Sequence, residues 1–402
     1  MWNYNRNDMI KNRHIYLLQW LLCSILTVLC AACSSGDEAE ENGATGVSHK
    51  QAKLAIYVYA PEQVAAKKHA ATTRANVGEV DGITDEGTID SLQIWIYESA
   101  TGNYVGHFST KDVTALNEGQ GTTYQIPVSD DFATNKPDVN VYVMANVTNA
   151  NCGVETLDKN TTTRTALLDG AKIANGHFGL EENTRTVPTD GLPFAGMLTG
   201  QPVVGDAPTL RVGTLSAVST VQLIRAVSKL RFVFAKTTGE PKVSITSIKM
   251  NDYMIPEVEY FFKTPESMTY NTEAKELLST TISDIAQTAD PTQFIYTNQT
   301  AQAYENLINE AANKQPKEVT VEGPIYLRES DKQLTGTITY TIGEGTPEPQ
   351  TVDFVMQQAG DFSRNHTWIV YAYYAGSGNL QVQSLYVKDW STKEFNHELY
   401  NW

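Results

Sequence analysis

Residues 52–59, Ala-Lys-Leu-Ala-Ile-Tyr-Val-Tyr, carry a large aliphatic side chain at every second position from Leu54 onward. Successive side chains of an extended chain point to opposite faces, so Leu54, Ile56 and Val58 share one face. A run of this length with a period of two predicts a β-strand that covers a hydrophobic core on one side.

The same period recurs along the chain in short apolar runs that Gly, Asn, Asp or Pro residues separate. Such runs predict antiparallel strands joined by turns. They lie at 89–97, 104–108, 139–146, 243–250, 323–327, 336–342, 351–357, 366–374 and 380–387. We therefore expect a mainly β fold of two β-sandwich-like domains, and about 370 residues after a leader are enough for two cores of ordinary size.

Longer breaks in the pattern suggest the domain limits. We expect an N-terminal sandwich at residues 51–220, with a polar loop at 61–88 inside it. The C-terminal sandwich is expected at 221–390, beginning at the apolar run Val221–Phe234. Two insertions interrupt the strand pattern and contain helical patterns; the insertions are 147–200 and 256–322, and the helical patterns lie at 162–175 and 301–312.

Residues 1–32 have the pattern of an export signal. Three basic residues precede the almost wholly apolar stretch 15–29, which is too short to span a bilayer comfortably. The stretch ends in Leu-Cys-Ala-Ala-Cys, which resembles a bacterial lipobox, so we expect cleavage between Ala32 and Cys33 and lipidation of Cys33. An ordinary secretory signal with incidental cysteines is the alternative. Residues 33–50 form an acidic linker that resembles the tag directing Bacteroidota lipoproteins to the outer face of the outer membrane.

Charge and cysteine content exclude several classes of partner and fold. Residues 1–32 hold three of the 30 Lys and Arg and one of the 46 Asp and Glu, so the remainder has a formal charge of −18. A surface this acidic repels nucleic acid and anionic lipid. Beyond the leader and Cys33, Cys152 is the one remaining cysteine, so we expect no disulfide framework and no metal site built on cysteine pairs.

The sequence contains no recognisable active site. The six histidines after the leader are far apart, and no HExxH pair, GxSxG elbow, P-loop or GxGxxG before a helix is present. The acidic run Asp81–Glu86 begins like a calcium loop, but Ile83 occupies a position where an oxygen ligand is required, so a solvated loop is the better interpretation. A pair of glycosidase carboxylates that meets only in the folded chain would leave no fixed spacing in the sequence, so this one class of hydrolase is not tested by motifs. We expect no enzyme, no cofactor and no metal.

Several segments in order resemble the fimbrillin family, the subunits of the type V pili of Bacteroidota. They are Leu54–Tyr59, Ile89–Tyr97 before a Gly-Asn turn, Val141–Asn146, Leu192–Gly196, Arg225–Leu230, Phe362–Asn365 and Val387–Trp390. The resemblance covers about 350 residues and rests on the order of the segments. It implies two β-sandwich-like domains of a transthyretin-like Greek-key type, no catalysis, and polymerisation by exchange of strands.

The family's maturation implies a cut by an arginine-specific protease between Arg74 and Ala75. Exposed loops are where proteases reach the backbone, although a lone arginine in a loop is also compatible with no role at all. The cut would release residues 33–74, and with them the lipid and the removable strand that carries Leu54, Ile56 and Val58. An apolar groove with unpaired edges would remain.

Residues 391–402 extend the chain beyond the last expected strand and have apolar residues at Phe395, Leu399, Tyr400 and Trp402. Family stalk subunits likewise end in a short extension that closes with Trp. We expect this segment, alone or together with residues 380–390, to be the donor strand that fills a neighbour's groove, with a tail docked on its own domain as the alternative.

The function predicted is therefore that of a structural pilin in adhesive fimbriae, first lipid-anchored at the cell outer membrane and then extracellular. Its expected partners are other pilin subunits in a homopolymer or mixed fimbria, an arginine-specific surface protease, the outer membrane through the lipid, and a host or bacterial surface ligand. A fimbrial tip adhesin and a monomeric surface glycan-binding lipoprotein are the alternatives, and a surface hydrolase has least support.

Overall fold

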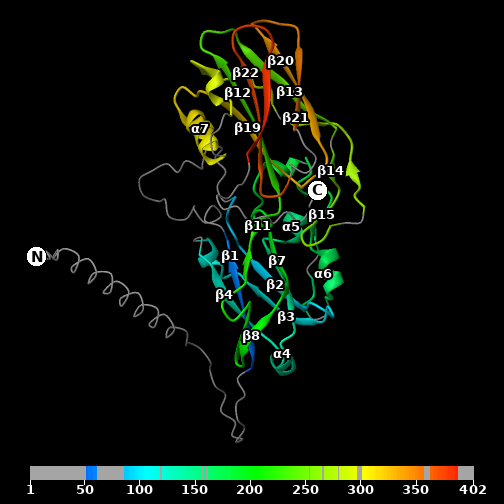
Figure 1. The fold of residues 1–402 in the computed structure, drawn as a ribbon. Helices are drawn as coiled ribbons and strands as arrows, with labels where there is room; N and C mark the ends of the chain where they lie inside the picture. Colours follow the sequence, from blue (N-terminus) through cyan, green and yellow to red (C-terminus); the bar gives the residue numbers. More distant parts are fainter. Residues whose placement is uncertain are drawn as a thin grey trace, which may run out of the picture. The chain divides into compact units, whose positions relative to one another are not determined.

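The computed structural model describes residues 51–60 and 86–387, apart from gaps at 118–119, 155–156, 160–161, 181, 253, 265–266, 279, 297–300 and 357–362. Cys33, Arg74, Ala75 and the segment 391–402 lie outside the described residues. The described part is mainly β, as predicted, and its longer strands are predominantly antiparallel (Figure 1). No helix within the described ranges has both the length and the apolar character needed to cross a membrane.

Two five-stranded sheets form the N-terminal part. The first contains β1 (Lys53–Tyr59), β4 (Thr122–Pro127), β8 (Val203–Asp206), β9 (Thr209–Val212) and β10 (Thr220–Gln222). The second has the order β11-β7-β5-β2-β3, with β2 (Leu92–Glu98), β3 (Tyr104–Thr110), β5 (Val139–Ala145), β7 (Phe194–Gln201) and β11 (Ile224–Arg225). Side chains from both sheets form one core, so this part is a β-sandwich as expected.

The C-terminal part is built from a five-stranded and a four-stranded sheet. The five-stranded sheet contains β12 (Ser228–Thr237), β18 (Gln287–Thr288), β19 (Thr320–Leu327), β22 (Thr367–Tyr374) and β23 (Gln381–Val387). The four-stranded sheet has the order β17-β13-β20-β21, with β13 (Val243–Asp252), β17 (Lys275–Glu276), β20 (Leu334–Ile342) and β21 (Gln350–Met356). Strand β12 pairs with β19 on one edge and in parallel with β22 on the other, which explains why nine of its ten residues are buried.

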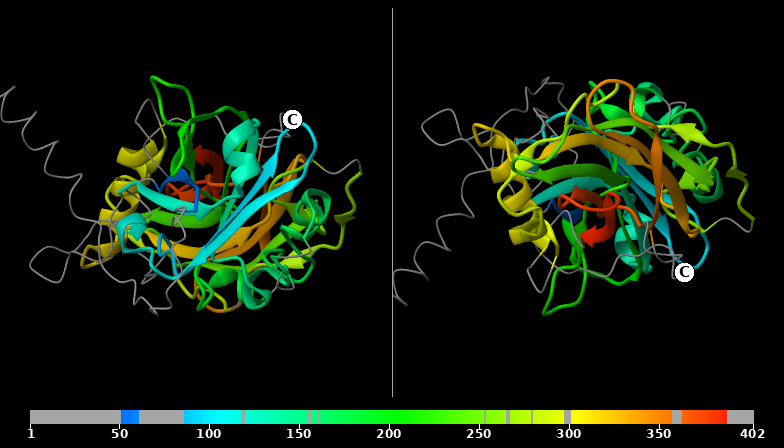
Figure 2. Two further views of the ribbon diagram at one scale, coloured as in Figure 1. Left: turned by 90° about the horizontal axis from the view of Figure 1, so that it is seen from below. Right: turned by 90° about the horizontal axis from the view of Figure 1, so that it is seen from above.

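Seven helices lie between the strands of the described part, five of them in the two insertions. They are α3 (Thr114–Asn117), α4 (Asp130–Asn135), α5 (Asn149–Cys152), α6 (Arg164–Gly170), η1 (Glu182–Arg185), η2 (Pro291–Phe294) and α7 (Ala301–Asn313), with the short strands β6 (Lys172–Ile173), β14 (Ile255–Pro256), β15 (Glu259–Tyr260) and β16 (Tyr270–Asn271). The helical patterns predicted near 162–175 and 301–312 correspond to α6 and α7. Tyr304 and Ile308 of α7 pack with Ile369 and Tyr371 of β22, which places α7 against this sheet (Figure 2).

The chain passes from the first pair of sheets to the second later than expected. Strand β10 pairs with β1, and β11 pairs with β7, so residues 220–225 still belong to the N-terminal sheets. The second pair of sheets begins with β12 at Ser228. A boundary just before Val221 is therefore a few residues early, because the apolar run Val221–Phe234 supplies strands to both sandwiches.

Candidate functional site

The strand predicted at 52–59 is β1, and its inner face is completely buried. Five alternating positions of this face are at most 1% exposed: Ala52, Leu54, Ile56, Val58 and Ala60. On the outer face Lys53 is exposed, whereas Ala55, Tyr57 and Tyr59 are half-buried. Burial on one face with a period of two is the pattern that the sequence predicted.

Strand β1 lies inside its sheet and has neighbours on both edges. Strand β4 runs antiparallel to it from the pair Lys53–Pro127 to the pair Val58–Thr122. On the other edge β9 pairs in parallel with residues 53–55 and β10 with residues 57–59. The segment 213–219 joins β9 to β10, so the middle of β1 has no ladder partner on that edge.

Three further backbone hydrogen bonds secure the ends of β1. The amide of Val128 donates to the carbonyl of Ala52 at 2.9 Å, and the amide of Lys53 donates to the carbonyl of Pro208 at 2.8 Å. At the other end the amide of Leu223 donates to the carbonyl of Tyr59 at 2.9 Å. The backbone of β1 is therefore bonded along most of its length.

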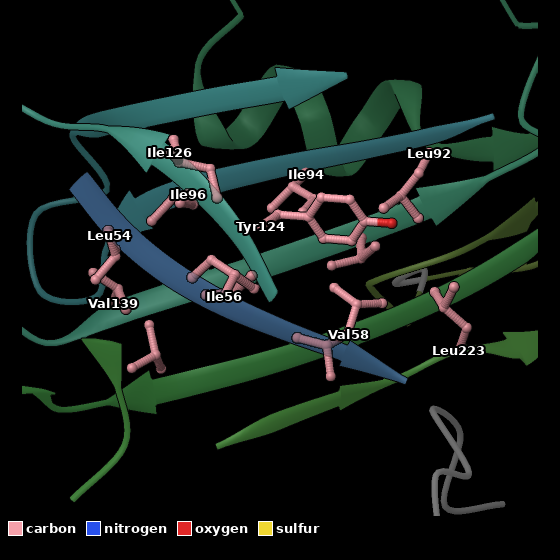
Figure 3. Packing of buried hydrophobic residues seen from close by; sticks show 14 of the residues in the cluster. Leu54, Ile56, Val58, Leu92, Ile94, Ile96, Tyr124, Ile126, Val139 and Leu223 are labelled. Atoms are coloured by element: carbon pink, nitrogen blue, oxygen red, sulfur yellow. The ribbon is translucent and has the colours of Figure 1, made fainter. Parts of the chain in front are cut away.

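The inner side chains of β1 face the second sheet of the sandwich. Leu54, Ile56 and Val58 lie in one cluster with Leu92, Ile94 and Ile96 of β2 and with residues of β5, and their mutual arrangement is visible in Figure 3. Loss of β1 would expose this core and would leave the edges of β4, β9 and β10 without their partner. We call the space that β1 occupies the β1 slot; it is lined by β4, β9, β10 and the facing residues of β2 and β5.

The outer face of β1 meets a glycine. Any side chain at Gly121, next to the first residue of β4, would overlap the ring and hydroxyl of Tyr57. Gly121 does not adopt a positive φ, so the close approach of Tyr57, and not the backbone conformation, is what favours glycine here. Tyr57 is thus fitted to the neighbouring strand even though it does not face the core.

Glu86, near the end of the expected cleavage loop (61–88), is the first residue that the structure describes after Ala60, and it is anchored. Its carboxylate accepts hydrogen bonds from Lys229 Nζ at 3.2 Å and from the Tyr326 hydroxyl at 2.6 Å, and its carbonyl accepts one from Arg225 Nε at 3.0 Å. Burial alone would raise the pKa of the Glu86 carboxyl, but Lys229, Arg225 and the bond from Tyr326 outweigh it and hold that pKa below its usual value. The expectation of a solvated loop is therefore wrong for Glu86.

Two buried asparagines hold the residues that follow. Asn117 pairs with both backbone groups of Ile89, each at 2.8 Å. Asn146, whose φ is +58°, accepts from the amide of Asp90 at 2.8 Å and donates to the carbonyl of Thr88 at 2.7 Å. A side-chain amide can replace backbone partners in this way, so residues 86–90 are fixed independently of β1.

Segments that carried the family resemblance meet beside Glu86, where the chain passes from one sandwich to the other. The Arg225 guanidinium lies 5.6 Å from the centre of the Phe194 ring and donates to Asn365 Oδ1 at 3.4 Å. The amide of Asn365 donates to the carbonyl of Val227 at 2.8 Å. These contacts give a physical role to residues of Leu192–Gly196, Arg225–Leu230 and Phe362–Asn365.

A buried charged cluster lies in the C-terminal part. The Arg364 guanidinium contacts Glu259 Oε1 at 2.9 Å and Glu329 Oε2 at 3.0 Å, and all three side chains are at most 2% exposed. Burial raises the pKa of Glu259 to about 8; Arg364 lowers it and the neighbouring Glu329 raises it further. The arginine contacts both carboxyl groups, so the cluster connects β15 with the segment after β19 and the segment before β22, and it is not arranged as a pair of catalytic carboxylates.

The remaining site predictions have different outcomes. Cys33, Arg74, Ala75 and the candidate donor segment 391–402 lie outside the described residues, so their roles stay predictions. Within the described ranges no group of His, Cys, Asp and Glu side chains could hold a metal ion. Cys152 is buried, and burial raises the pKa of its thiol.

The strand aromatics that a glycan-binding protein would use as platforms are mostly inside. Trp95, Tyr97, Tyr142, Trp368 and Tyr371 are buried. Tyr104, at 47%, is the exposed large aromatic side chain of the described part. The five buried side chains pack in the core.

The sequence did not identify the lining of the β1 slot. Strand β4 has the signal of a strand, since Tyr124, Ile126 and Val128 alternate and are buried. Strand β1 pairs in parallel with β9 and β10, and Tyr57 approaches Gly121. These contacts join residues that are far apart in the chain, so no local sequence pattern predicts them.

Comparison with known proteins finds a matching family. Residues 52–212 match the model of the family described as major fimbrial subunit protein (FimA), so the predicted resemblance is confirmed over a range that contains β1 and its neighbours up to β9. That family comprises structural fimbrial subunits and is not a class of enzymes. No curated protein matches the chain in sequence.

The solved structures to which the chain shows similarity include the following three. The tip fimbrial protein Mfa3 from Porphyromonas gingivalis with C-terminal truncation is 13% identical, with a TM-score of 0.44 over 85% of this chain and 100% of that chain. A putative cell adhesion protein from Parabacteroides distasonis is 13% identical, with a TM-score of 0.46 over 86% and 99% of the two chains. A fimbrial assembly protein from Parabacteroides distasonis is 11% identical, with a TM-score of 0.43 over 84% and 97%.

Proposed function

We propose that this chain, whose residues 52–212 belong to the major fimbrial subunit family, is an exported pilin in which β1 is a removable plug. Removal of β1 opens the β1 slot, and a strand from a neighbouring subunit fills it. The observation that carries the proposal is the position of β1: it is the first described strand, it lies between two edges, and its five inner side chains are buried.

The proposed route to the cell surface begins with the leader. Residues 1–32 direct export, cleavage occurs between Ala32 and Cys33, and lipid on Cys33 anchors the precursor in the outer membrane. The acidic linker 33–50 joins that anchor to β1, so the lipid and the plug belong to one piece of chain. A single cut beyond β1 then separates both from the rest of the subunit.

That cut is assigned to the bond between Arg74 and Ala75, made by an arginine-specific surface protease. Arg74 falls between the end of β1 at Tyr59 and the anchored residue Glu86. The bonds of Glu86, Asn117 and Asn146 hold the chain on the far side of the cut. Cleavage therefore frees β1 and leaves the two sandwiches and their junction in place.

Cleavage changes the competition for the slot. Each of Leu54, Ile56 and Val58 contributes about 1.5–3 kcal/mol by burial. While β1 is tethered it competes at an effective concentration on the order of millimolar, which excludes most donors. After the cut a dissociated β1 is diluted, so the exchange becomes effectively irreversible.

The donor that this subunit offers to its neighbour is assigned to residues 391–402. Phe395, Leu399, Tyr400 and Trp402 supply its apolar side chains. An inserted strand gains backbone hydrogen bonds from both edges of a slot, and its alternate side chains supply specificity.

The test is limited digestion of residues 34–402 with an arginine-specific protease, followed by addition of a labelled peptide of residues 51–61. We expect one early cut, release of the fragment that carries β1, and uptake of the peptide by the cleaved chain alone. The matched control Arg74→Ala should remain uncut in the loop and should take up no peptide. A chain that is trimmed at Arg74 and neither releases its fragment nor accepts the peptide would contradict the proposal and would favour the monomeric glycan-binding protein.

A further inference from the structure

We infer that the β1 slot selects the side chains on both faces of the strand inserted into it. The strand that replaces β1 then comes from a different kind of subunit, and not from residues 391–402 of a second copy of this chain. The inference rests on the proposed function, since it concerns the strand that replaces β1. It assigns to the partner a strand with five apolar side chains on one face and an aromatic side chain on the other.

The inner face of the slot specifies apolar side chains at five alternating positions. The two outer positions hold Ala52 and Ala60, and the three central positions hold Leu54, Ile56 and Val58, all at most 1% exposed. Protein cores are closely packed, so the two outer positions, which hold alanine, leave little space for larger groups. A polar group placed at any of the five would lose its water against a core of largely aliphatic side chains, which is unfavourable unless the group gains a hydrogen bond.

On the outer face of the inserted strand, the slot selects a side chain at the position next to Gly121. The ring of Tyr57 lies where any side chain at position 121 would be, and Tyr57 pairs across the ladder with Thr123. The strand position opposite Thr123 therefore accepts a large flat side chain that contacts the backbone of Gly121. This contact also fixes register, because a shift by one residue would turn the aromatic side chain into the core and the aliphatic ones to the outer face.

Residues 391–402 fit the inner face poorly when laid into the slot as a strand. In one phase Phe395 and Leu399 point inward, but His397 lies between them and Asn401 follows. When Tyr400 of this phase lies over Gly121, His397 takes the place of Leu54, Asn401 the place of Val58 and Phe395 the place of Ala52. Two polar groups would be buried without partners, and a phenyl ring would occupy the place of a methyl group.

The other phase of residues 391–402 fits the inner face of the slot even less well. Tyr400 and Trp402 then point inward together with Glu394, Asn396 and Glu398. Burial of a carboxylate without a partner opposes insertion far more strongly than burial of a neutral amide does. Every strand-like placement of this segment therefore puts polar side chains at positions that β1 fills with aliphatic ones.

The two ends of the subunit thus recognise different partners. The slot takes an apolar strand with a small–large–large–large–small inner face and an aromatic residue over Gly121, and residues 391–402 serve an acceptor of another kind. Assembly of this chain is then heterotypic, in a mixed fimbria.

The experiment uses residues 34–402 cleaved in the loop and three labelled peptides: residues 51–61, the same peptide with Tyr57→Ser, and residues 391–402. We expect the first peptide to displace the cleaved fragment, the second to require at least about tenfold higher concentration, and the third to show no displacement at a hundredfold excess. The acceptor variant Gly121→Ala should weaken binding of the first peptide and leave that of the second unchanged, because the three atoms nearest to the added methyl group all belong to the tyrosine. If that variant does not fold, the pair of peptides on the unmodified acceptor still tests the aromatic position.

The outcomes separate the inference from the proposed function. If the peptide of residues 51–61 itself fails to displace the fragment, the removable plug is refuted. If it displaces the fragment and residues 391–402 do so equally well, the plug stands and the heterotypic partner is refuted. If the Tyr57→Ser peptide displaces the fragment as well as the unmodified peptide does, the selection of an aromatic side chain on the outer face is refuted.

Discussion

The position of Ile56 allows the contribution of the plug to be measured. Ile56 is the central inner side chain of β1, is 1% exposed, and lies opposite Tyr124 of β4. We expect Ile56→Val to weaken retention of β1 by about 0.5–1.5 kcal/mol and Ile56→Ala by about 2–5 kcal/mol, because each removes buried carbon atoms and leaves a cavity. These energies correspond to about 2- to 12-fold and about 30- to 5,000-fold changes in the dissociation constant of β1.

The assay is displacement at equilibrium. Each variant of residues 34–402 is cut in the loop, and the concentration of the labelled peptide 51–61 that displaces half of the fragment is determined. That concentration should fall from the unmodified chain to Ile56→Val and further to Ile56→Ala. Lys53→Gln is the matched control, since Lys53 lies in the same strand with its side chain exposed and its exchange should leave the midpoint unchanged.

Two results would refute this reasoning. Equal midpoints for Ile56→Ala and the unmodified chain would mean that the inner face does not hold β1 in the slot. A shift of the same size for Lys53→Gln would mean that the assay reports general loosening of the cleaved chain and not the burial of one face.

Three further predictions concern the junction and the buried charges. Glu86→Gln should reduce the free energy of unfolding at pH 7 by about 1.5–3 kcal/mol, because Lys229 loses its counter-charge. Since the pKa of Glu86 is held below 4.5 in the folded chain, this contribution is present above that pH and is lost on acidification, so urea unfolding of the two proteins should converge in acid. Arg364→Ala should cost about 3–5 kcal/mol in the same measurement, because it leaves two buried carboxyl groups without their cation; a loss below about 1 kcal/mol would contradict the burial of the cluster. For Glu259 the sign is opposite: its pKa is raised from 4.5 to about 8, so the folded chain keeps a proton that the unfolded chain releases. Its contribution to stability should decline between pH 4.5 and 8 and level off above, and Glu259→Gln should remove that part of the pH profile.

Much of the β architecture could be predicted because the period of two is a local property. The strands expected at 52–59, 139–146 and 336–342 are present as β1, β5 and β20 within a few residues. The same reasoning identified the buried face of β1, since alternation alone decides which side chains share a face. Helix α7 could also be predicted, because Tyr304, Leu307 and Ile308 follow the helical period.

Pairing between distant segments could not be predicted in this way. The parallel ladders of β1 with β9 and β10 join residues 53–59 to residues 209–222. The sequence of neither segment indicates the strand with which it pairs. The domain boundary was placed early for the same reason, since Val221 reads as part of one apolar run but pairs with Val58. Glu86 was misjudged because its ion pair with Lys229 depends on how the two sandwiches join.

The ladder around β1 also bears on how exchange proceeds. In the described sheets β4 and β10 have β1 as their sole ladder partner, and β9 retains only β8 once β1 is gone. An empty slot would therefore leave two strands without backbone partners and a core open to water, which is a state of high free energy. The incoming strand should thus enter while β1 leaves, pairing residue by residue with the edges that β1 gives up.

The dependence of rate on concentration tests this order of events. If entry and departure are coupled, the observed rate of fragment release should rise in proportion to the concentration of peptide 51–61. If β1 must leave first, the rate should reach a plateau that no further peptide raises. Ile56→Ala separates the two cases: a plateau, if one exists, should rise with this substitution, because the departing strand then gives up less burial. A rate independent of peptide in both proteins would contradict coupled exchange and would mean that β1 leaves before the peptide enters.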